Sequence, residues 1–200
     1  MKPTPFYPSI DKLLKDLNGQ LPSYGHLLST FEWKQLRAAI IKRDKNCCTQ
    51  CGVTPTEFIM GRHFRDYSDI EVDRLIKSGS QIYTMNDMID SETGYAGSTF
   101  SEYPIYLHVH HQYYIFGKYP WQYEESALTT LCNKCHIELH EHSKIPYYQD
   151  EARKIEMNLQ PCIRCNGAGH FEEYSHIENG ICFSCRGAKY VELIGQYAVS

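Results

Sequence analysis

Nine cysteines set the chemistry that this 200-residue sequence could support. Eight of them form four Cys-x-x-Cys pairs, which are Cys48 and Cys51, Cys132 and Cys135, Cys162 and Cys165, and Cys182 and Cys185. In a reducing compartment, short paired spacings indicate metal sites more often than disulfides. The four pairs supply enough thiolates for two tetrahedral zinc sites and leave Cys47 over.

A second group of candidate ligands consists of histidines. His136 and His140 are four residues apart, so on a helix both imidazoles lie on one face and can share a metal ion. A metalloprotease helix needs Glu directly after the first His, where this chain has Ile137. His110 and His111 end a β-prone segment, and adjacent strand residues point to opposite sides. One of the two can therefore bind metal while the other faces the reacting centre.

An ordinary structural role is the alternative for these residues. Taken alone, His108, His110 and His111 also fit a strand whose imidazoles hydrogen-bond locally. The histidines that we expect to be surface or helix-end residues are His26, His63 and His142. The nearby cysteine pairs favour the metal site over this alternative.

The composition bounds the class of protein. An apolar fraction of 42% can form a core, and the length suggests one or two domains. No apolar run approaches the length of a membrane span, and the first residues lack the apolar stretch of a secretory signal. We therefore expect a soluble cytoplasmic protein. A net charge of -4 disfavours a uniformly basic nucleic-acid binder but permits a local basic patch.

The elements that must position these residues follow from periodicity and capping signals. An N-terminal arm is predicted over residues 1–28. Ser29 and Glu32 resemble a capping box for a helix that ends near Asp44. The alternating segment 105–110 predicts a strand, and 133–142 a helix. Further helices are expected over 70–77 and 147–157.

Three segments together resemble the HNH endonuclease family. They are Arg43-Asp44-x-x-x-Cys48-x-x-Cys51-Gly52, Leu107-x-Val109-His110-His111 and Leu131-Cys132-x-x-Cys135-His136-x-x-x-His140. The resemblance implies an α+β fold, in which two antiparallel strands and a helix hold one catalytic divalent ion. It also implies a structural zinc that Cys48, Cys51, Cys132 and Cys135 bind. The predicted nuclease domain covers 29–160, with an insertion at about 53–104 that forms a subdomain or contacts the substrate.

The resemblance also implies a role for each histidine. His111 resembles the general base, His110 the metal ligand before it, and His136 the final His of the motif. His140 resembles the extra helix ligand of the His-rich, colicin-like branch. All-imidazole ligation suits Mn, Co, Ni or Zn better than Mg.

One position departs from the family pattern. Ala127 stands where the motif has an Asn that braces the loop and orients the base. Three substitutes remain open, namely a backbone carbonyl from the loop 117–121, Gln112 or Gln122.

The segment 161–200 is predicted to be a separate zinc ribbon-like module. Its pairs Cys162/Cys165 and Cys182/Cys185 resemble the cysteine-rich finger of J-domain co-chaperones, and sixteen residues separate them. That spacing suits a second structural zinc held by all four thiolates. The module could dock a partner protein, contact DNA or cap the domain.

The function predicted from these motifs is hydrolysis of phosphodiester bonds in DNA. Double-stranded DNA is the expected substrate, and phage defence, phage biology or mobile-element biology is the expected setting. Phosphate contacts are expected from Lys34, Arg37, Lys42, Arg43 and Lys118. The main alternative is a non-catalytic zinc adaptor that binds nucleic acid or a partner protein through 161–200 or 53–104. A zinc hydrolase of another type is disfavoured, because no water-activating carboxylate stands at a diagnostic spacing.

Overall fold

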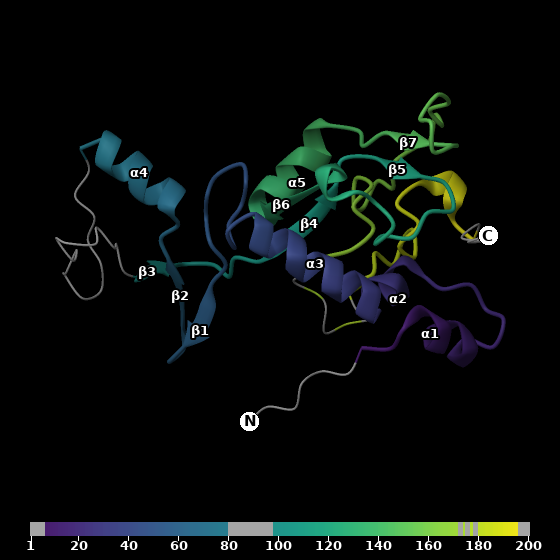
Figure 1. Cartoon of the computed structure of the whole chain (residues 1–200), viewed down its shortest axis with the longest axis horizontal. Coiled ribbons are helices and arrows are strands. Elements are labelled where there is room, and N and C mark those ends of the chain that lie inside the picture. Colours follow the sequence, from purple (N-terminus) through teal and green to yellow (C-terminus); the bar gives the residue numbers. More distant parts are fainter. Residues whose placement is uncertain (1–6, 80–97, 172–173, 175–176, 178–179, 196–200) are drawn as a thin grey trace. The chain divides into compact units, whose positions relative to one another are not determined.

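The computed structural model describes residues 7–79, 98–171, 174, 177 and 180–195 (Figure 1). Helices and strands are both present, so the predicted α+β class is confirmed. Among the residues described, no helix is both long and apolar enough to cross a membrane. The chain divides into two compact units. The domain boundaries that we expect near residues 28 and 160 stay predictions.

The first unit comprises 1–40, 111–129 and 137–200. It begins with two short helices, α1 (Ile10–Asp16) and α2 (Tyr24–Leu28). Each helix starts at a serine whose hydroxyl accepts a backbone N–H of the first turn, Ser9 in α1 and Ser23 in α2. The segment predicted as an N-terminal arm therefore contains two capped helices.

Helix α3 (Phe31–Arg43) confirms the predicted helix, but the predicted capping box is wrong. Ser29 ends α2, and the hydroxyl of Thr30 accepts the backbone N–H of Trp33 at 3.4 Å. Glu32 instead accepts the backbone N–H of Ile10 at 3.1 Å. Glu32 therefore bonds a residue 22 positions away in sequence in place of the predicted capping box. A local motif cannot reveal such a long-range partner.

The core of the first unit gathers around the C-terminal cysteines. Its buried members include Tyr114, Tyr147, Leu159 and Tyr190 together with all four sulfurs of that region. Strand β5 (Tyr114–Ile115) pairs in parallel with β7 (Tyr147–Tyr148). The first unit also contains the short 3-10 turns η1 (Glu125–Ala127) and η4 (Val191–Leu193).

The helix predicted over 147–157 is wrong. Tyr147 and Tyr148 form β7, and the chain then turns with Arg153 at a φ of 55°. Met157 donates its backbone N–H to Tyr147 at 2.7 Å, a hairpin-like contact. The reason is tertiary, because Tyr147 is buried against Tyr114 and Tyr190 and needs an extended backbone to pair with β5.

The second unit comprises 41–110 and 130–136. Strands β1 (Glu57–Ile59), β2 (Arg62–Asp66) and β3 (Ser98–Ser101) form an antiparallel sheet in that order. Met60 and Gly61 both adopt positive φ in the β1–β2 turn, as a two-residue hairpin requires. Helix α4 (Asp69–Lys77) confirms the prediction for 70–77 and begins with a Ser68/Glu71 capping box. The sequence Gly94-Tyr95-Ala96-Gly97-Ser98 predicts a turn, and its first four residues lie outside the described ones.

Three further elements carry the candidate site. Strand β4 (Leu107–His111) pairs with β6 (Leu128–Cys132), and α5 (Asn133–His142) follows β6 directly (Figure 1). The strand and helix predicted for these segments are confirmed. Because α5 is one continuous helix, His136 and His140 are held one turn apart.

Candidate metal centres

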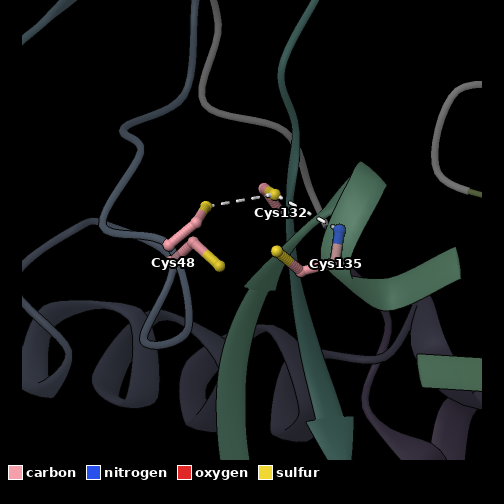
Figure 2. Close-up of side chains that lie close together, drawn as sticks. Cys48, Cys132 and Cys135 are labelled. Atoms are coloured by element: carbon pink, nitrogen blue, oxygen red, sulfur yellow. Dashed lines mark hydrogen bonds between the residues drawn. The ribbon is translucent and has the colours of Figure 1, made fainter. Parts of the chain in front are cut away.

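The first cysteine cluster unites Cys48, Cys51, Cys132 and Cys135. Their sulfurs all lie within 4.8 Å of one another, and those of Cys51 and Cys132 are 3.7 Å apart. Figure 2 shows the sulfurs of Cys48, Cys132 and Cys135 turned toward one another. Four thiolates about 2.3 Å from one tetrahedral ion are roughly 3.8 Å apart, whereas a disulfide needs about 2.05 Å. The cluster therefore fits a structural zinc.

Local turns aim the sulfurs of this cluster. Cys48 donates its backbone N–H to Val53 at 2.8 Å, and Gly52 donates to Cys48 at 2.7 Å. Gly52 has a φ of 87°, which a residue with a side chain rarely adopts. The backbone N–H of Cys135 points at the sulfur of Cys132 at 3.5 Å. Hydrogen bonding between Cys48 and Cys132 lowers the pKa of Cys48 and raises the pKa of Cys132, so Cys48 is the first of the two to form a thiolate.

Asp44 joins the end of α3 to β6 beside this cluster. Its Oδ2 accepts the backbone N–H of Thr130 at 3.0 Å, and its Oδ1 accepts the Arg43 guanidinium at 2.8 Å. Burial alone would raise the pKa of Asp44, but the bonds from Arg43 and Thr130 outweigh it and hold that pKa below its usual value. Thr130 also accepts the backbone N–H of Thr49 at 2.9 Å. The first cysteine pair is therefore tied to the strand that leads into the second pair, through one backbone bond and the Asp44 side chain.

The second cysteine cluster unites Cys162, Cys165, Cys182 and Cys185, all of them buried. The sulfurs of Cys162 and Cys182 are 3.9 Å apart, and those of Cys165 and Cys185 are 3.7 Å apart. The spacing again fits one tetrahedral zinc. The pairing of cysteines into two clusters therefore agrees with the prediction.

Each cysteine pair of the second cluster is followed by a turn of the same kind. Asn166 and Gly167 have φ of 47° and 85°, and Arg186 and Gly187 have φ of 51° and 82°. Gly169 donates its backbone N–H to the sulfur of Cys165 at 3.3 Å. The glycines thus permit the tight turn that follows each pair.

A third group consists of imidazoles. Ring nitrogens of His110, on β4, and of His136 and His140, on α5, lie within 4.8 Å of one another. The rings of His110 and His136 meet edge to face at a centroid distance of 5.4 Å. Three neutral imidazoles can bind a transition-metal ion and leave positions open for other ligands. The three residues that the sequence nominated as ligands are thus brought together.

His108 is an additional neighbour of this group. It lies two residues before His110 and therefore on the same face of β4. Its ring stacks on that of His136, with centroids 4.6 Å apart and planes 10° apart. His108 is not among the ligands predicted from the sequence, although its spacing of two residues from His110 is a signal that places it on the same face.

His140 is oriented by a backbone group. Its Nδ1 lies 3.0 Å from the carbonyl oxygen of Asn166. Burial lowers the pKa of His140 to about 4, although the bond to Asn166 acts in the opposite direction. The ring is therefore neutral at physiological pH, as a metal ligand must be.

His111 has a different environment from His110. It is only 1% exposed, and its ring stacks on Trp33 and meets Tyr123 edge to face. Its Nε2 lies 2.9 Å from the carbonyl oxygen of Pro120. Burial lowers the pKa of His111 to about 3, against the influence of that bond.

The carbonyl of Pro120 belongs to one of the three groups predicted to orient His111 in place of an Asn at position 127. The structure places this carbonyl of the loop 117–121 within hydrogen-bond distance of His111, and the role of His111 stays a prediction. Gln122 instead accepts the backbone N–H of Tyr119 within that loop. Ala127 is buried and accepts the backbone N–H of Gln112.

Some predicted phosphate contacts already have partners within the chain. Arg43 pairs with Asp44, and both carboxylate oxygens of Glu151 accept from Lys118 at 2.8 Å. Lys34 lies over the ring of Tyr7, 5.4 Å from its centroid. The role of Lys34, Arg37, Lys42, Arg43 and Lys118 in DNA binding stays a prediction.

Comparison with known proteins gives no match. No protein-family model matches the sequence, and neither a curated protein nor a solved structure is detectably similar to the chain. The functional assignment therefore depends on the geometry of the site.

Proposed function

We propose that this protein is a metal-dependent endonuclease of the HNH type that hydrolyses phosphodiester bonds in DNA. The observation that carries the proposal is the convergence of His110, His136 and His140 within 4.8 Å. The second supporting feature is the cysteine cluster whose last member, Cys135, directly precedes His136 on α5. A zinc bound there would fix the start of the helix that carries two of the three imidazoles.

A divalent ion held by these imidazoles would supply Lewis-acid stabilisation of charge on the phosphate and on the leaving 3′ oxygen. The chain itself must bind the substrate and accept a proton from the attacking water. His111 is the proposed acceptor. Because the carbonyl of Pro120 can only accept a hydrogen bond, Nε2 donates and Nδ1 of the neutral ring keeps its lone pair. Since His111 is 1% exposed, this role requires the surrounding aromatic side chains to open to water.

The burial of His111 favours a second candidate function, that of a non-catalytic zinc adaptor. In that case the bond to Pro120 and the stack on Trp33 make His111 a core residue. The two cysteine clusters would then present a surface to a nucleic acid or a partner protein.

A nicking assay on supercoiled plasmid separates the two candidates. The zinc-loaded protein is supplied with Mn²⁺, Ni²⁺ or Co²⁺, and His136→Ala and His111→Ala are compared with His142→Ala. His142 lies on the same helix but is exposed, and its Nδ1 bonds the carbonyl of Glu138, so it is the matched control. The nuclease predicts metal-dependent cutting by wild type and His142→Ala and its loss in the other two variants. Cutting that survives in His136→Ala would refute the assignment, and wild-type protein that never cuts favours the adaptor.

A further inference from the structure

A hydrogen bond connects α5 with the C-terminal cysteine module, which we define as the described residues of the segment 161–195. It joins His140 Nδ1 to the carbonyl oxygen of Asn166 at 3.0 Å. Because a carbonyl has no proton to give, Nδ1 is the donor and carries the hydrogen. The nitrogen of His140 that remains for a metal ion is then Nε2.

The position of the Asn166 carbonyl depends on the first cysteine turn of the module. Asn166 directly follows Cys165 and donates its backbone N–H to Cys162 at 2.7 Å. Its φ of 47° and the φ of 85° at Gly167 turn the chain sharply at this point. A Cβ at Gly167 would lie 3.9 Å from Nδ1 of His140, so the turn packs directly on the imidazole.

The cysteines that make this turn need a metal to hold them. Cys162 and Cys165 belong to the buried cluster whose sulfurs fit one zinc, and the described residues of the module hold little regular structure besides η4. In a module this small, metal binding and folding are coupled. The Asn166 carbonyl is therefore fixed when the cluster is filled.

We propose that the C-terminal cysteine module, when loaded with zinc, positions His140 for metal binding through the backbone carbonyl of Asn166. This inference rests on the proposed histidine metal centre and assigns the module a part in it. Neighbours that bond the second nitrogen of a ligating histidine commonly change metal affinity by 10- to 100-fold. The module then stabilises the histidine metal centre, and a change in its turn at Asn166 should lower the affinity of that centre for metal.

Two substitutions at Asn166 test the carbonyl without deleting it. Asn tolerates positive φ, Gly adopts it without strain, and a β-branched residue is strongly disfavoured there. Asn166→Gly should keep the carbonyl in place, whereas Asn166→Val should displace it. Arg186→Val is the matched control, because Arg186 follows Cys185 in the equivalent turn with a φ of 51°.

The experiment titrates Ni²⁺ into the zinc-loaded proteins by calorimetry, with zinc content measured for each. We expect Asn166→Val to weaken binding of the third ion by about tenfold or more, with Asn166→Gly and Arg186→Val within about threefold of wild type. Equal weakening by Asn166→Val and Arg186→Val, or unchanged binding by Asn166→Val, would overturn this inference and leave the proposed histidine centre standing. A wild-type protein that binds no third ion would overturn the histidine centre as well.

A second measurement covers the case in which Asn166→Val loses its zinc. In zinc-loaded wild-type protein without the third ion, a long-range ¹H–¹⁵N spectrum should place the proton of His140 on Nδ1. A proton on Nε2 would overturn the inference, because the Asn166 carbonyl would then have no donor from His140.

Discussion

His111 Nε2 lies 2.9 Å from the carbonyl oxygen of Pro120, nine residues further along the chain. This bond, together with the stack on Trp33, makes His111 part of the buried interior. A residue proposed as the general base therefore also stabilises the fold, and the two roles need separate tests.

His111→Ala should reduce the free energy of unfolding by roughly 2–4 kcal/mol, because it leaves a cavity beside Trp33 and an unpaired carbonyl at Pro120. Urea unfolding of the zinc-loaded protein measures the change. His142→Ala, on the exposed end of α5, should change stability by less than about 1 kcal/mol. Equal stabilities for the two variants would mean that His111 is not the core residue that its burial indicates.

The Asp44 carboxylate gives a pH-dependent contribution to stability. Its pKa is held below the usual 3.8, so the folded state favours the charged form. The stabilisation is therefore complete above the unfolded pKa and disappears as the pH falls through the folded pKa. Asp44→Asn should cost about 1–2 kcal/mol at pH 7, and its deficit relative to wild type should shrink only below about pH 4.

Urea unfolding at pH 7, 5 and 3 follows this deficit, and zinc loss at the lowest pH affects both proteins equally. Asp73→Asn, at an exposed position of α4, is the control and should show no deficit at any of these pH values. A deficit for Asp44→Asn that already shrinks between pH 7 and 5 would point to another titrating group.

The first cysteine cluster can be tested against the ninth cysteine. Cys135→Ser removes one of four sulfurs and should lower the zinc content from two ions to one. Cys47→Ser is the control, because Cys47 is buried but belongs to neither cluster. Metal analysis after gel filtration gives the counts, and a loss of zinc from Cys47→Ser would show that the cluster has a different ligand set.

His108 should act on the histidine centre through its stack on His136. His108→Phe retains an aromatic ring and should keep Ni²⁺ affinity within about threefold, whereas His108→Ala should weaken it by about tenfold. Calorimetric titration of the zinc-loaded variants compares them. An equal loss in both variants would indicate that His108 itself ligates the ion.

Much of the site could be read from the sequence because its signals are local. Helix α5 is predicted from periodicity, and the His136/His140 spacing places both imidazoles on one face of it. The cysteine pairs are recognised by their Cys-x-x-Cys spacing. The partners that orient the imidazoles could not be read, because the carbonyls of Pro120 and Asn166 belong to any residue type.

The errors have the same origin. The helix expected after residue 147 is replaced by a strand, because Tyr147 pairs with β5 across more than thirty residues of chain. Glu32 accepts a hydrogen bond from the backbone N–H of Ile10 and does not form the expected capping box. In both cases a tertiary contact outweighs a local preference.

The most direct test of the central claim is the number of metal ions that the folded protein binds. Native mass spectrometry after loading with zinc and Ni²⁺ should find three ions in wild type, two of which resist a mild chelator. His136→Ala should retain the two resistant ions and lose the third, whereas His142→Ala should keep all three. A wild-type protein that holds only two ions, or a third ion that survives in His136→Ala, would contradict a metal centre at His110, His136 and His140.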